Sequence, residues 1–227
     1  MPTILLVRHG QASFGGADYD VLSPHGHAQT AVLAADLAAR GLSVDRVLSG
    51  SLARQRDTAE PVAAAVGCSV AVDSRWNEYD MDDILAHHSA TEARASRPPG
   101  GERPAVSPRE FQALLEQALG AWVSADGGSS TVEPWPAFAA RVRSGLAELI
   151  ESLPSGGTAL VFTSGGVLAA LSVALLGIPA NAFIALNRVC VNTGVTKVVH
   201  GRRGTTLISF NDHSHLERAD RELVTYR

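Results

Sequence analysis

The sequence contains a single lysine and only two cysteines among its 227 residues. Of the 19 basic residues Lys197 alone is lysine, so arginine carries nearly all of the positive charge. An arginine in this chain is therefore informative only where its position adds information. Cys68 and Cys190 have neither the spacing of a metal site nor the pattern of a disulfide framework. We expect both to be buried free thiols.

Two further absences bear on location and partners. No basic segment followed by an apolar run opens the chain, and no apolar run reaches membrane-spanning length. The formal net charge of -4 and the sequence pI near 6.0 argue against nucleic acid as a partner. The sequence therefore predicts a soluble cytoplasmic protein that binds neither membrane nor nucleic acid. It leaves the oligomeric state open.

What the chain does contain is a regular alternation of strand and helix patterns. With 45% hydrophobic residues it is long enough to bury a sizeable core in one domain. Short apolar runs typical of buried strands occur at residues 4–7, 46–49, 69–72 and 158–163. Helical patterns lie between them. This order predicts an α/β fold, a three-layer sandwich with a mostly parallel sheet and helices on both faces.

Residues 80–133 interrupt that alternation. Loop-forming runs at 97–101 and 126–130 flank a helix that begins at Ser107-Pro108. We expect this region to be a helical insertion over one end of the sheet, within a single domain spanning residues 1–227.

Two local details also carry expectations. Pro61 should kink or restart the helix that begins near Arg54, because its ring removes a backbone donor. The run Gly201-Arg202-Arg203-Gly204 has the composition of a hairpin turn between two closing strands.

Polar residues follow the first buried strand at the point where it ends. Arg8 offers a fork of donors suited to phosphate or carboxylate, and His9 offers a neutral ring nitrogen near pH 7. Gly10 turns the chain after them. Alone, this tripeptide is better explained as two polar residues at a turn that ends a buried strand.

Two other strand-to-helix junctions carry groups of the same kind. Arg54 lies just inside the helix after Ser49-Gly50-Ser51, and Ser164-Gly165-Gly166 opens a helix after another buried strand. In a parallel sheet these junctions share one edge, where ligands bind. Arginines, a histidine and the free N–H groups of a glycine-rich helix start suit a tetrahedral dianion. Glu78, after a further strand, is placed to supply an acid.

At this point the sequence resembles the histidine phosphatase superfamily, whose fold is that of phosphoglycerate mutase. Its first motif is matched by Arg8, His9 and Gly10. Its second motif is matched by Ser51, Leu52, Arg54, Thr58 and Ala59. The resemblance covers nearly the whole chain. It implies a phosphoryl group transferred to His9, neutralised by Arg8 and Arg54, with Glu78 as proton donor and no metal or cofactor.

Two positions depart from the family pattern. The family has a second histidine where this chain has Ser164, and loss of one charged donor is expected to cost about 10²–10³ in rate. In the loop after Gln11, Phe14 and Gly15 stand where many members have a phosphate-binding asparagine. We expect Gln11, Ser164 and Gly165 to contact phosphate.

Several of these residues could instead have purely structural roles. Gln11 is equally suited to supporting the turn, and Ser164 to capping the helix that follows it. Glu78 shares its loop with Asp80, Asp82 and Asp83, and is the least secure choice. His213 and His215 are expected to be exposed and structural, respectively.

The sequence is compatible with three functions. The leading hypothesis is a metal-independent hydrolase of small phosphate monoesters. A phosphoglycerate mutase ranks lower, because residues 80–133 lack the long charged segment that would bind phosphoglycerate. A pseudo-phosphatase that binds phosphorylated ligands is compatible with Ser164, but it has no need of His9.

Overall fold

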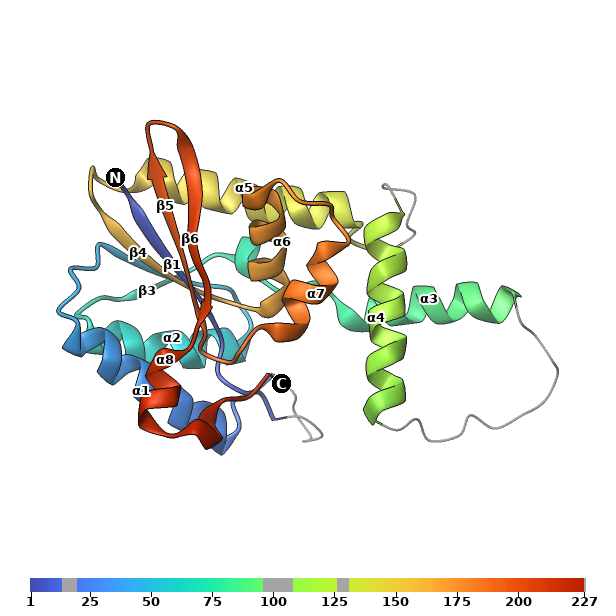
Figure 1. Ribbon diagram of the computed structural model, residues 1–227, viewed down its shortest axis with the longest axis horizontal. Helices are drawn as coiled ribbons and strands as arrows, with labels where there is room; N and C mark the ends of the chain where they lie inside the picture. The colour runs from blue at the N-terminus through green and yellow to red at the C-terminus, as the bar shows by residue number, and fades with distance from the viewer. Residues whose placement is uncertain (14–19, 96–107, 126–130, 227) are drawn as a thin grey trace.

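The computed structural model describes residues 1–13, 20–95, 108–125 and 131–226 (Figure 1). Its centre is a six-stranded sheet in the order β3-β2-β4-β1-β5-β6. The strands are β1 (Thr3–Arg8), β2 (Arg46–Ser49), β3 (Val70–Val72), β4 (Thr158–Thr163), β5 (Val195–Gly201) and β6 (Gly204–Asp212). The first four run parallel, whereas β5 is antiparallel to β1 and β6 to β5. The predicted α/β fold is confirmed, with a mixed sheet.

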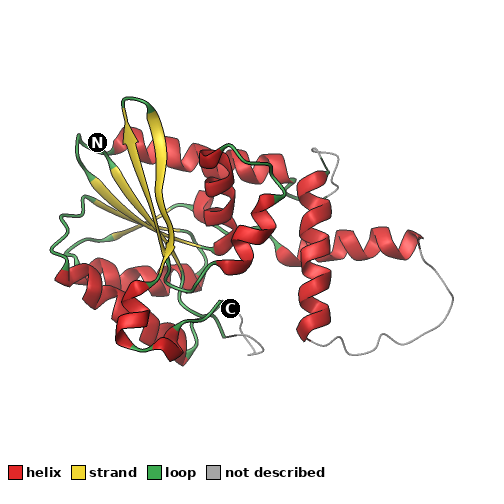
Figure 2. Cartoon of the chain, viewed as in Figure 1, coloured by secondary structure: helices red, strands yellow, loops and turns green. Residues whose placement is uncertain are grey.

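Helices cover both faces of this sheet (Figure 2). They are α1 (Pro24–Ala39), α2 (Ala53–Ala65), η1 (Ser74–Trp76), α3 (Met81–Ala95), α4 (Pro108–Ser124), α5 (Trp135–Ser152), α6 (Gly165–Leu176), α7 (Ala182–Val189), α8 (Ser214–Ala219) and η2 (Arg221–Leu223). No helix in the described ranges is long and apolar enough to cross a membrane.

Strand β1 shows how the sequence produces the layers. Its side chains alternate between faces, so Ile4 and Leu6 join the core beneath α5 and α6. Leu5 and Val7 join the separate core beneath α1 and α2. Burying such an aliphatic side chain contributes about 1.5–3 kcal/mol, and both faces of this strand are covered. The run is continuously apolar for that reason.

Helices α3 and α4 project beyond the carboxyl end of the sheet (Figure 1). Ile84 of α3 and Leu115, Leu119 and Trp122 of α4 belong to the same core as α5 and α6. This pair of helices occupies part of the region expected to be an insertion. The loop runs 97–101 and 126–130 lie outside the described residues.

Helix α2 does not restart at Pro61, because it continues past the exposed proline with Val62 and Ala63 on its buried side packed in the core beneath the sheet. Asp80, Asp82 and Asp83 do not share a loop: Asp80 accepts a hydrogen bond from the Asp83 backbone N–H (3.0 Å) at the start of α3. Acidic residues in a first turn are stabilised by the helix dipole.

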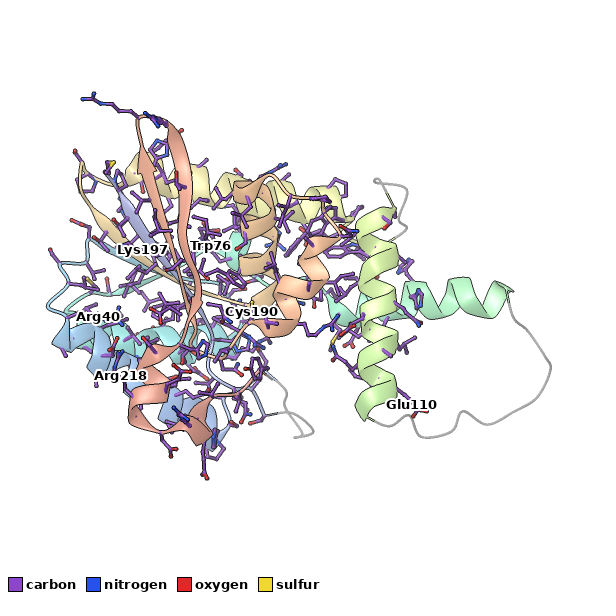
Figure 3. The ribbon with its side chains drawn as sticks, viewed as in Figure 1. Arg40, Trp76, Glu110, Cys190, Lys197 and Arg218 are labelled. Carbon is purple, nitrogen blue, oxygen red and sulfur yellow. The ribbon has the colours of Figure 1, made fainter. Side chains whose placement is uncertain are left out.

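The interior holds Trp76 and Cys190, whereas Arg40 at the end of α1 and Arg218 of α8 are exposed and Lys197 of β5 is half-buried (Figure 3). Both cysteines are free thiols, as expected, although Cys68 is only half-buried. Burial raises the pKa of the Cys190 thiol to about 12, so this sulfur is un-ionised near neutral pH.

Two helical glycines should respond oppositely to alanine. A Cβ on Gly26 would lie 2.2 Å from the Gln11 carbonyl oxygen, so Gly26→Ala should lower the free energy of unfolding by about 2–3 kcal/mol. A Cβ on Gly120 would make only an ordinary contact with Ile184 (3.6 Å), so Gly120→Ala should raise it by about 0.5–1 kcal/mol. Urea unfolding of both variants checks the pair, and equal effects would contradict the close approach at Gly26.

Candidate active site

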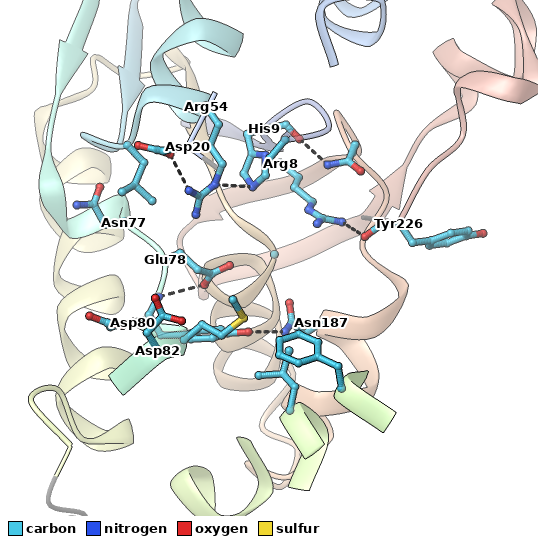
Figure 4. A pocket seen from close by; sticks show the side chains of 18 residues that line it. Arg8, His9, Asp20, Arg54, Asn77, Glu78, Asp80, Asp82, Asn187 and Tyr226 are labelled. Atoms are coloured by element: carbon cyan, nitrogen blue, oxygen red, sulfur yellow. Dashed lines mark hydrogen bonds and ion pairs between the residues drawn. The ribbon is translucent and has the colours of Figure 1, made fainter. Parts of the chain in front are cut away.

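The carboxyl ends of the four parallel strands open into one cavity of about 470 Å³ (Figure 4). Arg8 is the last residue of β1 and His9 follows it, and the start of α2 contributes Arg54. Glu78 follows β3 and η1, and Gly165 opens α6 after β4. The structure thus brings these five sequence-predicted residues together in one place.

His9 lies at the base of the cavity with 5% of its surface exposed. Its Nδ1 lies 2.6 Å from the Gly10 carbonyl oxygen, which can only accept, so Nδ1 carries the ring hydrogen. Nε2 then holds a lone pair and accepts a hydrogen bond from Arg54 Nε (3.2 Å). Burial, followed by the charges of Arg54 and Arg8, holds the pKa of His9 well below 6.5. The imidazole is therefore neutral, with its nucleophilic nitrogen on the Arg54 side.

Arg54 is fixed by Asp20. Arg54 Nη1 donates to Asp20 Oδ1 (2.7 Å), and Asp20 Oδ2 accepts from the Ala53 backbone N–H at the start of α2 (2.7 Å). One carboxylate thus caps the helix and orients the guanidinium that contacts His9. Asp20 was not among the site residues predicted from the sequence, because nothing local indicates that it meets a helix more than thirty residues away.

Arg8 is held by main-chain oxygens from the far end of the chain. Its Nη1 donates to the carbonyls of Cys190 and Tyr226, the latter at 2.6 Å. These acceptors are neutral, so the two bonds orient the guanidinium without neutralising its charge. Asn192 adds a third tie to this region by donating from Nδ2 to the His9 carbonyl (3.1 Å). Neither Asn192 nor Tyr226 was among the predicted site residues.

Glu78 lies between the arginines and the outer part of the cavity (Figure 4). Its carboxylate accepts from the backbone N–H groups of Gly166 (3.0 Å) and Tyr79 (3.2 Å). Burial raises the pKa of Glu78 above its ordinary value, and the Gly166 bond and Arg54 oppose that rise. A Cβ on Gly166 would lie 2.2 Å from Glu78 Oε1, so the glycine permits this approach. Glu78 is thus suited to hold and release a proton.

Two predicted phosphate ligands do not line the cavity. Ser164 is fully buried, and its Oγ accepts from Gln55 Nε2 (2.8 Å) without capping α6. Gln11 Oε1 accepts from the Ser23 hydroxyl (2.8 Å), and its backbone N–H donates to Gln29 Oε1 (2.8 Å). Gln11 therefore joins the loop to α1, which matches the turn-supporting alternative. Phe14 and Gly15 lie outside the described residues.

The remaining histidines named from the sequence lie elsewhere. His215 is buried and its Nε2 meets the Thr193 hydroxyl at 3.0 Å, outside the residues that line the cavity. Burial lowers the pKa of His215 to about 4, so it is neutral near pH 7. His213 is half-buried and its Nδ1 lies 2.7 Å from the Asn211 carbonyl oxygen.

This chain is similar to known proteins over most of its length. Residues 4–213 match the histidine phosphatase superfamily, branch 1. The probable phosphoglycerate mutase GpmB of Klebsiella pneumoniae is 29% identical over 188 residues, which span 80% of this chain and 78% of that protein.

Solved structures with the same fold include phosphatases. A mycobacterial glucosyl-3-phosphoglycerate phosphatase in complex with inorganic phosphate is 26% identical, with a TM-score of 0.66 over 94% of this chain and 98% of that one. A phosphoserine phosphatase from Entamoeba histolytica shares the fold at 19% identity, with a TM-score of 0.68 over 95% of this chain and 100% of that one. The match over 4–213 is decisive: the chain belongs to the histidine phosphatase superfamily.

Proposed function

We propose that this protein is a metal-independent hydrolase of phosphate monoesters that works through a phosphohistidine at His9. The observation that carries this proposal is the state of the His9 ring. Its Nδ1–H is committed to the Gly10 carbonyl, which leaves the Nε2 lone pair in a cavity beside Arg54. A neutral, fixed imidazole between two guanidinium groups is the arrangement that nucleophilic attack on a phosphoryl dianion requires.

The first step forms a nitrogen–phosphorus bond. The Nε2 lone pair attacks phosphorus while the bond to the leaving oxygen breaks, and Glu78 gives its proton to that oxygen. Arg8 and Arg54 neutralise the equatorial oxygens, as fixed cations do in phosphoryl transfer. Gly165 at the start of α6 lines the same cavity, and this end of the helix carries the positive end of the helix dipole.

The second step releases phosphate. Glu78, now a carboxylate, takes a proton from water, whose oxygen attacks phosphorus as the bond to Nε2 breaks. Inorganic phosphate and the regenerated imidazole result, and Glu78 is again protonated. Ser164 lies directly before Gly165 and is held by Gln55, so we assign it to supporting this junction. Relative to a cationic donor at that position, the serine is expected to cost about 10²–10³ in rate.

A mutase is the second candidate, favoured by the 29% identity to a probable phosphoglycerate mutase. The two activities differ only in the acceptor of the phosphoryl group, which is water in one and a second hydroxyl in the other.

The products tell these functions apart. Purified protein with a chelator is incubated with p-nitrophenyl phosphate and, separately, with 3-phosphoglycerate. The proposal predicts release of inorganic phosphate from p-nitrophenyl phosphate in the presence of chelator. Conversion of 3-phosphoglycerate to its 2-isomer faster than phosphate release would establish the mutase instead. Phosphate binding with no turnover of either compound would identify a binding protein.

A further inference from the structure

The cavity extends well beyond the groups that hold a phosphoryl dianion. Its outer wall is built by the residues that follow η1 and by α3, α4 and α7. Figure 4 shows Asp80, Asp82 and Asn187 on the side of Glu78 that faces away from His9. A bound ester with phosphorus at His9 therefore places its alcohol portion against this outer wall.

One part of the outer wall is apolar and firmly built. The Tyr79 ring is fixed by edge contacts with Phe138 and Phe183, at centroid distances of 6.0 and 6.1 Å. Its hydroxyl accepts a hydrogen bond from Asn187 Nδ2 (3.2 Å). Phe111 and Leu115 of α4 also line the cavity. This wall favours an alcohol with an apolar or aromatic body.

The charges of the cavity are divided between its two ends. Among the described residues that line it, Arg8 and Arg54 are the basic ones, and both lie at the His9 end together with one carboxylate, Asp20, which is paired with Arg54. Asp80 and Asp82 are exposed at the outer end, and no ion pair holds either of them within the described ranges. The Asp83 N–H holds the Asp80 carboxylate at the start of α3. The outer end is therefore negative where the inner end is positive.

From this division we infer that the substrate is a phosphate monoester of an uncharged or cationic alcohol with an apolar or aromatic body. Esters whose alcohol carries a carboxylate, the phosphoglycerates included, are disfavoured because that carboxylate would meet Asp80 and Asp82. The inference rests on the proposed function of the same cavity. It separates this protein from relatives whose names specify phosphoglycerate.

Three synthetic esters test the charge preference. They are 4-methylphenyl, 4-(aminomethyl)phenyl and 4-(carboxymethyl)phenyl phosphate, which share an aryl body and differ in a charge insulated from the ring. The wild-type kcat/KM should be higher for the aminomethyl than for the carboxymethyl ester by about tenfold or more, the size of one partly screened charge contact.

The double variant Asp80→Asn/Asp82→Asn is the matched control, because asparagine retains the oxygen that caps α3. In this variant the kcat/KM values of the two charged esters should lie within about threefold of each other. The value for the 4-methylphenyl ester should stay within about twofold of wild type, since no charge has been removed from the His9 end. Phe111→Ala should instead lower kcat/KM for all three aryl esters by about tenfold and leave kcat/KM for methyl phosphate unchanged.

The outcomes separate this inference from the proposed function. Equal or faster turnover of the carboxymethyl ester by wild type would overturn the charge preference, as would a preference that persists in the double variant. If none of the esters is hydrolysed, the hydrolase proposal has failed. The dissociation constants of the same three esters, measured by calorimetry, then decide the charge preference by their order.

Discussion

Replacing His9 by alanine is expected to lower kcat for p-nitrophenyl phosphate by about 10⁴–10⁶, the scale on which removing a catalytic nucleophile acts in other enzymes. The physical reason is that no other described residue of the cavity presents a neutral nitrogen to phosphorus between two arginines. Steady-state release of p-nitrophenol, with chelator present, measures the loss.

A folded but inactive variant is the required result, so two controls accompany it. His27→Ala removes an exposed histidine of α1 and should leave kcat unchanged. His9→Ala should still bind inorganic phosphate within about tenfold of wild type, because Arg8 and Arg54 remain. Retention of more than about 1% of wild-type kcat in a folded His9→Ala protein would contradict the nucleophile assignment.

Glu78→Gln is expected to lower kcat by about 10²–10⁴ for an alkyl phosphate. An alkoxide needs a proton as it leaves, whereas p-nitrophenolate is stable without one. The loss for p-nitrophenyl phosphate should therefore be at least tenfold smaller, as an estimate from the size of proton-transfer catalysis. Glutamine keeps only one of the two side-chain oxygens that accept hydrogen bonds at this position. Glu217→Gln, on the exposed face of α8, therefore serves as the folding control.

The pH dependence follows from the two pKa shifts. His9 has a pKa well below 6.5, so it stays unprotonated and nucleophilic at neutral pH. Burial raises the pKa of Glu78 above its ordinary value, so the acid form persists further up the pH scale than for an exposed glutamate. The kcat/KM for an alkyl ester should fall as pH rises through the pKa of Glu78. That falling limb should be absent in Glu78→Gln, and a limb that persists would assign the proton to another group.

The convergence of Arg8, His9, Arg54 and Glu78 could be anticipated because it depends only on sheet topology. Each of these residues ends or follows a parallel strand, and the carboxyl ends of parallel strands meet at one edge. Apolar runs locate the strands well when both sheet faces are buried, as at β1. The fold class followed from the same pattern.

The hydrogen bonds between distant segments could not be predicted from the sequence. Arg8 meets the Tyr226 carbonyl across more than two hundred residues, and a carbonyl at that position has no signature in the sequence. Asp20 is one of several acidic residues in a polar loop, and only the chain path shows that it caps α2. Ser164 was expected at phosphate because of its place at a junction, but Gln55 holds its hydroxyl in the interior.

Helix α3 was missed for a different reason. Residues 81–95 carry two adjacent histidines and several polar residues, so the apolar periodicity is weak. Its start depends on electrostatics: Asp82 and Asp83 lie in the first turn and Asp80 accepts the Asp83 N–H. Acidic residues there were interpreted as competitors for the role of Glu78, whereas two of them lie at the outer end of the cavity.

The most direct test of the account is the chemical identity of the phosphorylated intermediate. The enzyme is mixed with a rapidly cleaved aryl phosphate, quenched in alkali to preserve phosphohistidine, and analysed by ³¹P NMR and peptide mass spectrometry. Because Nδ1 donates to the Gly10 carbonyl and Nε2 faces Arg54, we expect a single phosphoryl group on Nε2 of His9. Phosphorylation at Nδ1, at another residue, or at no residue during steady turnover would contradict it.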